Sequence, residues 1–128
     1  MNKQEMFNLI FCQALKQGER SLRNLQDDPL QGNSDSCAYR GLNGKRCFIG
    51  FIIPDELYSP AYEKHSVCEL FEMSGELSDL LTPSDMSTYD AVNFLSQLQG
   101  IHDSTSPEIW EENLEKLAAQ HDLEVPTC

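Results

Sequence analysis

Apolar residues recur at helical spacing in the first segment of the chain. The apolar set is Met6, Phe7, Leu9, Ile10, Ala14 and Leu15, and the polar set between them is Lys3, Gln4, Glu5, Gln13 and Lys16. This pattern predicts an amphipathic helix over residues 3–17. Gly18 follows, and glycine takes the left-handed backbone conformation that commonly ends a helix. We therefore expect the helix to end there.

Three pairs of a hydroxyl residue and proline predict helix starts further along: Ser59-Pro60, Thr82-Pro83 and Ser106-Pro107. The hydroxyl oxygen can accept a hydrogen bond from a free backbone N–H, and proline lacks an N–H that would have no helical partner at that position. Apolar stripes follow the second and third pairs. The helix predicted after Thr82-Pro83 is expected to end at Gly100. Ser74-Gly75 interrupts the pattern before Leu81, which predicts two short helices at about 65–73 and 76–81.

The centre of the chain carries a turn signal and a short apolar run. Asn43-Gly44 favours a tight turn with positive φ at both residues, which predicts a small β-hairpin near residues 37–48. The seven residues from Cys47 to Ile53 suit a buried strand or two helical turns, and Gly50 weakly favours a short helix against which another element packs closely. Residues 27–36 are rich in Asp, Pro, Gln, Asn and Ser, which predicts a surface loop.

With 128 residues, of which 40% are hydrophobic, the chain has the size of one ordinary domain. The fold class that we predict is mainly α, a single compact domain over 1–128 with about five or six helices. We expect the following residues to share its core: Phe7, Ile10, Met86, Val92, Leu95, Trp110, Leu114 and Leu117.

The charge balance restricts the partners. Nine Lys and Arg against 21 Asp and Glu give a net charge of −12, which opposes direct binding to nucleic acid or to anionic membranes. The same charge attracts basic proteins. No apolar run approaches the roughly 20 residues of a membrane span, and the first residues lack the order of a secretory signal. We therefore expect a cytoplasmic protein.

Cysteine and histidine are the candidates for chemistry. The five cysteines include no Cys-x-x-Cys pair, and in a reducing cytosol the expected state is free thiol. A zinc site at Cys37, Cys47, His65 and Cys68 is an alternative, although structural zinc ligands are usually more tightly spaced. A nucleophile at Cys47 with His102 as base would need an electropositive setting that this acidic chain lacks. We expect no enzyme, no cofactor and a structural hydrogen bond for His102-Asp103.

Acidic residues form the predicted binding site. Glu69, Glu72, Glu76 and Asp79 recur at three or four residues beside an apolar stripe, and Asp55 and Glu56 follow the central segment. Solvation explains any one carboxylate, but the net charge exceeds the magnitude of about 2–8 that suits solubility in a small domain. We predict that these six residues contact a basic protein, and nucleases are common partners of this kind. Self-association is left open.

Two resemblances add to this interpretation. The segments from Cys37 to Arg40, Gly44 to Gly50, Ile53 to Tyr58 and Leu98 to Asp103, with Trp110 and Leu114, resemble a family of small bacterial and phage proteins without assigned chemistry. In size and charge the chain is also similar to immunity proteins of contact-dependent growth inhibition. That similarity implies a protein that neutralises a cognate toxin domain, often a tRNA-cleaving nuclease. The alternative is a small zinc-stabilised or phage-encoded regulatory domain.

Overall fold

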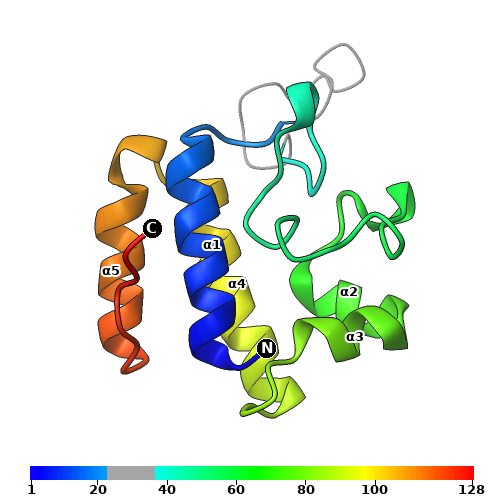
Figure 1. Ribbon diagram of the computed structural model, residues 1–128. Coiled ribbons are helices and arrows are strands. Elements are labelled where there is room, and N and C mark those ends of the chain that lie inside the picture. Colours follow the sequence, from blue (N-terminus) through cyan, green and yellow to red (C-terminus); the bar gives the residue numbers. More distant parts are fainter. Residues whose placement is uncertain (23–36) are drawn as a thin grey trace.

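The part of the chain that the structure describes folds into five α-helices joined by short turns. The computed structural model describes residues 1–22 and 37–128, so the whole of the predicted loop at 27–36 lies outside the described part. The helices are α1 (Lys3–Gln17), α2 (Val67–Met73), α3 (Gly75–Leu81), α4 (Thr88–Ser104) and α5 (Trp110–Gln120). Helix α5 contacts both α1 and α4, whereas α2 contacts α3 and α4 (Figure 1). The mainly α prediction is confirmed.

Helix α1 begins and ends where local chemistry indicates. The Asn2 side chain accepts from the Glu5 N–H, and the Glu5 carboxylate accepts from the Asn2 N–H, so two backbone donors at the helix start are satisfied. Gly18 lies in the left-handed region with φ 64°, and its N–H donates to the Ala14 carbonyl. The predicted helix over 3–17 is therefore confirmed at both ends.

The start and end predicted for α4 are wrong. Its N-cap is Ser87, whose side chain accepts from the Asp90 N–H, and not Thr82. The Thr82 hydroxyl instead donates back to the Ser78 carbonyl at 2.7 Å, at the end of α3. The helix also continues through Gly100 to Ser104, because Gly100 does not take a positive φ and so costs only about 1 kcal/mol of helix propensity.

The other two hydroxyl-proline pairs each begin a single 3₁₀ turn, at Pro60–Tyr62 and at Pro107–Ile109. Helix α2 has a capping box of its own at Ser66, and α5 follows directly after the second turn. The interruption at Ser74 is confirmed, since this residue ends α2 and caps α3. This part of the chain therefore forms two short helices, as predicted.

The central segment is a buried turn rather than a strand. The Phe51 N–H donates to the Cys47 carbonyl at 3.0 Å, but no continuous helix forms across these residues. A Cβ atom at Gly50 would lie 2.1 Å from the Tyr39 carbonyl oxygen, so glycine permits the close approach that the sequence suggested. The predicted hairpin is reduced to one antiparallel bridge between Arg40 and Arg46, within the described residues.

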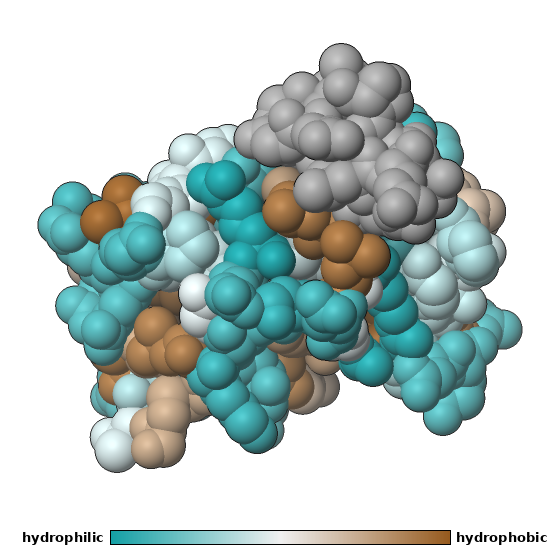
Figure 2. All heavy atoms as spheres, turned by 90° about the horizontal axis from the view of Figure 1, so that it is seen from above, coloured by the Kyte–Doolittle hydropathy of each residue, from teal (hydrophilic) through white to brown (hydrophobic). Residues whose placement is uncertain are grey.

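All five helices and the central segment contribute side chains to the core. Of the predicted core residues, six are buried: Phe7, Ile10, Leu95, Trp110, Leu114 and Leu117. Met86 and Val92 are only half-buried, near the start of α4. Figure 2 shows one face of the molecule, where hydrophilic residues dominate and the hydrophobic residues form small separate groups.

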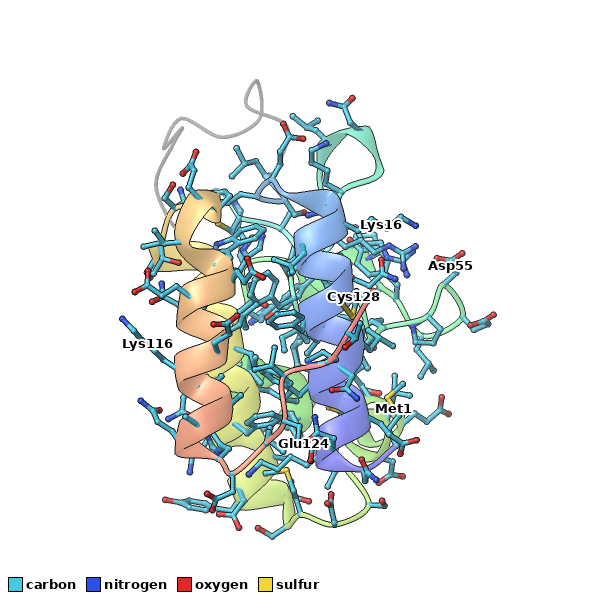
Figure 3. The ribbon with its side chains drawn as sticks, turned by 60° about the vertical axis from the view of Figure 1, so that its left-hand side comes forward. Met1, Lys16, Asp55, Lys116, Glu124 and Cys128 are labelled. Carbon is cyan, nitrogen blue, oxygen red and sulfur yellow. A yellow bond between two sulfur atoms is a disulfide. The ribbon has the colours of Figure 1, made fainter. Side chains whose placement is uncertain are left out.

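The chain after α5 folds back along α1. Asp122 takes a positive φ of 55°, and the Leu123 N–H donates to the Ala118 carbonyl at 2.8 Å. The Gln4 side chain then exchanges two hydrogen bonds of 2.9 Å with the backbone of Glu124. Figure 3 shows this segment running along α1 as far as Cys128. We call residues 122–128 the C-terminal strap.

A disulfide joins the strap to α1. Cys128 is bonded to Cys12, and their Cα atoms are 5.5 Å apart. The prediction that all cysteines are free thiols is therefore wrong for this pair. The odd count and the spacing gave no sign of the bridge, because the two residues are separated by 116 positions and meet only when the strap returns to α1.

Candidate functional site

The six predicted site residues are all exposed, but they belong to two separate segments. Glu69 and Glu72 lie on α2, and Glu76 and Asp79 lie on α3, the helix that packs beside it. We call these four residues the acidic surface. Asp55 and Glu56 lie in the turn after the central segment and form a separate group. The six residues of the sequence prediction thus lie on one helical surface and in one separate turn.

Three members of the acidic surface form no ion pair within the described residues. Glu72, Glu76 and Asp79 make no hydrogen bond or ion pair with any residue in the described part of the chain. The buried side chains of Leu70 and Leu77 anchor the two helices that carry them. These carboxylates are therefore displayed on packed helices, and no described residue pairs with their negative charge.

Glu69 has a local structural role. Its carboxylate accepts from the Ser66 N–H at 2.9 Å and lies 3.2 Å from Nδ1 of His65. The hydrogen bond from the Ser66 backbone is the main reason that the pKa of Glu69 is lowered, followed by the interaction with His65. This carboxylate stabilises the start of α2 and is less available to a partner than its neighbours.

Asp55 is compensated by arginine. Its carboxylate pairs with the Arg40 guanidinium, and the nearest Arg46 nitrogen is 3.5 Å away. Figure 3 labels Asp55 at the edge of the molecule, on the same side as Lys16. Glu56, the next residue, has no such partner among the described residues. The two residues therefore differ in the charge that they present.

Charge is distributed unevenly along the chain. Residues 65–115 include eleven of the 21 acidic residues and none of the nine Lys and Arg residues. The eleven are Glu69, Glu72, Glu76, Asp79, Asp85, Asp90, Asp103, Glu108, Glu111, Glu112 and Glu115. This segment contains all of α2, α3 and α4. The sequence prediction selected individual carboxylates and did not use the absence of Lys and Arg over this whole segment.

Cys37, His102 and Asp103 bring possible metal-ligand atoms within 4.8 Å of one another. His102 is fully buried, with Nε2 accepting from the Ser21 N–H at 3.0 Å and Nδ1 donating to Asp103 Oδ1 at 2.8 Å. Since the Ser21 N–H can only donate, it requires an unprotonated Nε2, and the ring proton is assigned to Nδ1. Both ring nitrogens of His102 form hydrogen bonds, and the bond to the Ser21 N–H connects α4 to Ser21. The hydrogen bond expected between His102 and Asp103 is confirmed, but the pair lies within α4 and not in a loop between two helices.

The structure does not assemble the alternative zinc quartet within the described residues. Cys37, Cys47, His65 and Cys68 do not appear together as a metal-binding group within the described residues. Cys47 is buried and Cys68 is exposed, whereas the His65 ring faces Glu69. Burial raises the pKa of the Cys47 thiol, which keeps it protonated near neutral pH. Cys47 therefore packs as a small apolar side chain.

His121 provides a pH-sensitive contact at the end of α5. Its ring packs edge-on against Phe94 with centroids 4.9 Å apart, and Nε2 lies 2.7 Å from Gln97 Oε1, to which it can donate. Burial lowers the pKa of His121, and the nearby Lys3 charge lowers it further. The unfolded chain therefore takes up this proton at a higher pH than the folded one.

We expect this difference to weaken the fold in mild acid. As the pH falls through the unfolded value of about 6.5 towards the lower folded pKa, the free energy of unfolding should decrease. Denaturant titrations above and below that value would measure the decrease. His121→Gln should make this decrease smaller. The difference between variant and parent gives the contribution of His121 apart from that of the carboxylates. An identical pH dependence in both proteins would contradict the assignment.

A groove of about 320 Å³ lies apart from the acidic surface, between α1 and the central segment. Its lining residues are Leu9, Gln13, Gln17, Gly44, Arg46 and Phe51. Gln17 accepts from the Arg46 N–H and donates to the Arg46 carbonyl, so its side chain joins the two walls. The groove is lined by apolar, amide and guanidinium groups.

Comparisons with protein-family models, curated proteins and solved structures find no match to this chain. The two resemblances proposed from the sequence therefore stay predictions. Among the described residues, no helix combines the length and the apolar character that a bilayer crossing requires. The functional argument rests on the chain's own geometry and charge.

Proposed function

We propose that this chain is an immunity-type inhibitor that binds a basic nuclease toxin through the acidic surface. The observation that carries the proposal is the absence of Lys and Arg from residues 65–115 together with the unpaired carboxylates on α2 and α3. A nuclease binds the negative phosphates of RNA with Lys and Arg. Carboxylates carry the same negative charge as phosphates and can therefore bind the same side chains. An acidic protein seated in that cleft excludes the RNA.

Glu72, Glu76 and Asp79 are the principal contact residues in this proposal. They are exposed, they have no intramolecular partner among the described residues, and packed helices hold their backbones. Glu69, Asp55 and Glu56 are secondary contact residues in the proposal. Asp55 contributes less because Arg40 already neutralises it. In this role the inhibitor acts in the cytoplasm of the cell that makes the toxin, and it needs no cofactor.

Exposed carboxylates of this kind affect the association rate of a complex more than its affinity. Complementary fields raise the association rate, and salt screens them. Reversing Glu72, Glu76 and Asp79 to Lys should slow association with the toxin about 10-fold or more at low salt. The variant should also show a weaker salt dependence. Its unfolding should change little, because isolated exposed charges add little stability.

The partner for the test is the toxin domain encoded beside this chain in its genome. Association rates and protection of RNA from cleavage are measured at several salt concentrations. The matched control is Glu108→Lys, Glu111→Lys and Glu115→Lys, which changes the net charge equally at exposed positions on another part of the molecule. Equal losses in both variants would assign the effect to total charge rather than to the acidic surface. No binding to the toxin by the parent protein would refute the immunity function.

A further inference from the structure

We propose that the Cys12–Cys128 pair is a thiol–disulfide exchange site, which a dithiol opens by attacking Cys128. The proposal does not depend on the proposed inhibitor function. It rests on three features of the structure: the unequal exposure of the two sulfur-bearing residues, the way the C-terminal strap is held, and the charge beside Cys12. Each feature favours attack at one sulfur and departure of the other.

The two cysteines differ in their access to solvent. Cys128 is exposed, whereas Cys12 is half-buried and packs against the core from the middle of α1. An attacking thiolate must approach a sulfur atom directly, so access helps to decide which sulfur is attacked. The exposed residue is Cys128.

The strap is held in two parts. Its first part has hydrogen bonds of its own, from Leu123 to Ala118 and between Glu124 and Gln4, and Leu123 packs against the core. Residues 125–128 make no hydrogen bond or ion pair with any described residue, so the disulfide is their only such link. Breaking the disulfide therefore frees these four residues while Leu123 and Glu124 keep α5 and α1 connected.

A lysine follows Cys12 by one helical turn on α1. Lys16 follows Cys12 by four positions on α1, and side chains at this spacing lie on the same face of a helix. Figure 3 shows Lys16 and Cys128 near the same stretch of α1, whereas Lys116 lies on α5. A nearby ammonium group favours a thiolate over a thiol, and a better leaving thiolate speeds exchange.

The exchange balances as a two-electron reduction. A thiolate of the dithiol attacks Cys128 Sγ, forming a mixed disulfide, while the bond to Cys12 breaks and Cys12 leaves as a thiolate that then takes up a proton. The second thiol of the reductant attacks the reductant's own sulfur in the mixed disulfide. This step releases Cys128 as a thiol and leaves the reductant oxidised to a disulfide.

The test identifies which sulfur is attacked. Oxidised protein carrying Cys68→Ser, which removes an exposed free thiol, is treated briefly with reduced glutathione. Glutathione is a monothiol and has no second thiol of its own to resolve the mixed disulfide, so this intermediate can be trapped early in the reaction. The reaction is quenched with N-ethylmaleimide, and peptides are mapped without reduction. We expect the Cys12–Cys128 peptide before treatment, and then glutathione on Cys128 with maleimide on Cys12. Absence of the disulfide at the start, or glutathione mainly on Cys12, would overturn the proposal.

Two further readings separate exchange in the folded protein from reduction of unfolded chains. Far-UV circular dichroism and Trp110 fluorescence should stay unchanged while the disulfide is lost. Lys16→Gln should slow the reaction about 2- to 3-fold at low salt, whereas the control Lys116→Gln should leave the rate unchanged. Reduction that requires unfolding, or equal rates in the two lysine variants, would contradict the mechanism.

Discussion

Replacing Trp110 by alanine should lower the free energy of unfolding by about 3–5 kcal/mol, because a buried aromatic loses transfer energy and leaves a cavity. Only 1% of Trp110 is exposed. Its ring lies edge-on to Phe48 with centroids 4.9 Å apart and stacks on His102 at 5.4 Å. The indole N–H also donates to the Thr105 carbonyl at 3.3 Å. The substitution thus affects contacts between α5, α4 and the central segment.

Chemical denaturation followed by circular dichroism would measure this loss. The control is Tyr89→Ala, which removes an aromatic ring that is 77% exposed and should change stability by less than about 0.5 kcal/mol. If the two variants unfold at the same denaturant concentration as the parent, Trp110 does not hold the core together.

Replacing Cys12 by serine should lower the free energy of unfolding of the oxidised protein by about 2–5 kcal/mol. The disulfide closes a loop between residues separated by 116 positions, and a cross-link over so long a loop strongly restricts the unfolded chain. The folded structure should change little, because Leu123 and Glu124 hold the strap by other contacts.

Denaturant titrations with and without a reductant provide the check. The parent should lose stability when the disulfide is reduced. Cys12→Ser lacks the disulfide, so its free energy of unfolding should be the same with and without the reductant. Cys68→Ser serves as the control, since this cysteine is exposed and outside the bridge. A reductant effect of the same size in Cys12→Ser would show that another cysteine is responsible.

The parts of the fold that could be predicted from the sequence have their signals close together. Helix α1 is such a case, because its apolar stripe and Gly18 lie within one short segment. The start of α4 could not be chosen reliably, since Thr82 and Ser87 both offer a hydroxyl group with an aspartate three residues later. The structure resolves the choice through a non-helical turn after Thr82, whose hydroxyl serves the end of α3.

The parts that could not be predicted depend on contacts between distant residues. No pattern relates Cys12 to Cys128, because their meeting requires both the turn at Asp122 and the pairing of Glu124 with Gln4. The candidate site shows the same limit. The exposed carboxylates of α2 and α3 follow from the helical pattern, but the neutralisation of Asp55 by Arg40 depends on a turn that brings separate segments together.

The uneven distribution of charge has a practical consequence for labelling. No primary amine lies on α2, α3 or α4, because the lysines are residues 3, 16, 45, 64 and 116. Reagents that acylate amines therefore attach fluorophores, biotin or a sensor surface to other parts of the chain. A protein immobilised by amine coupling is therefore attached outside α2 and α3, with Lys64 the attachment point nearest to them in sequence.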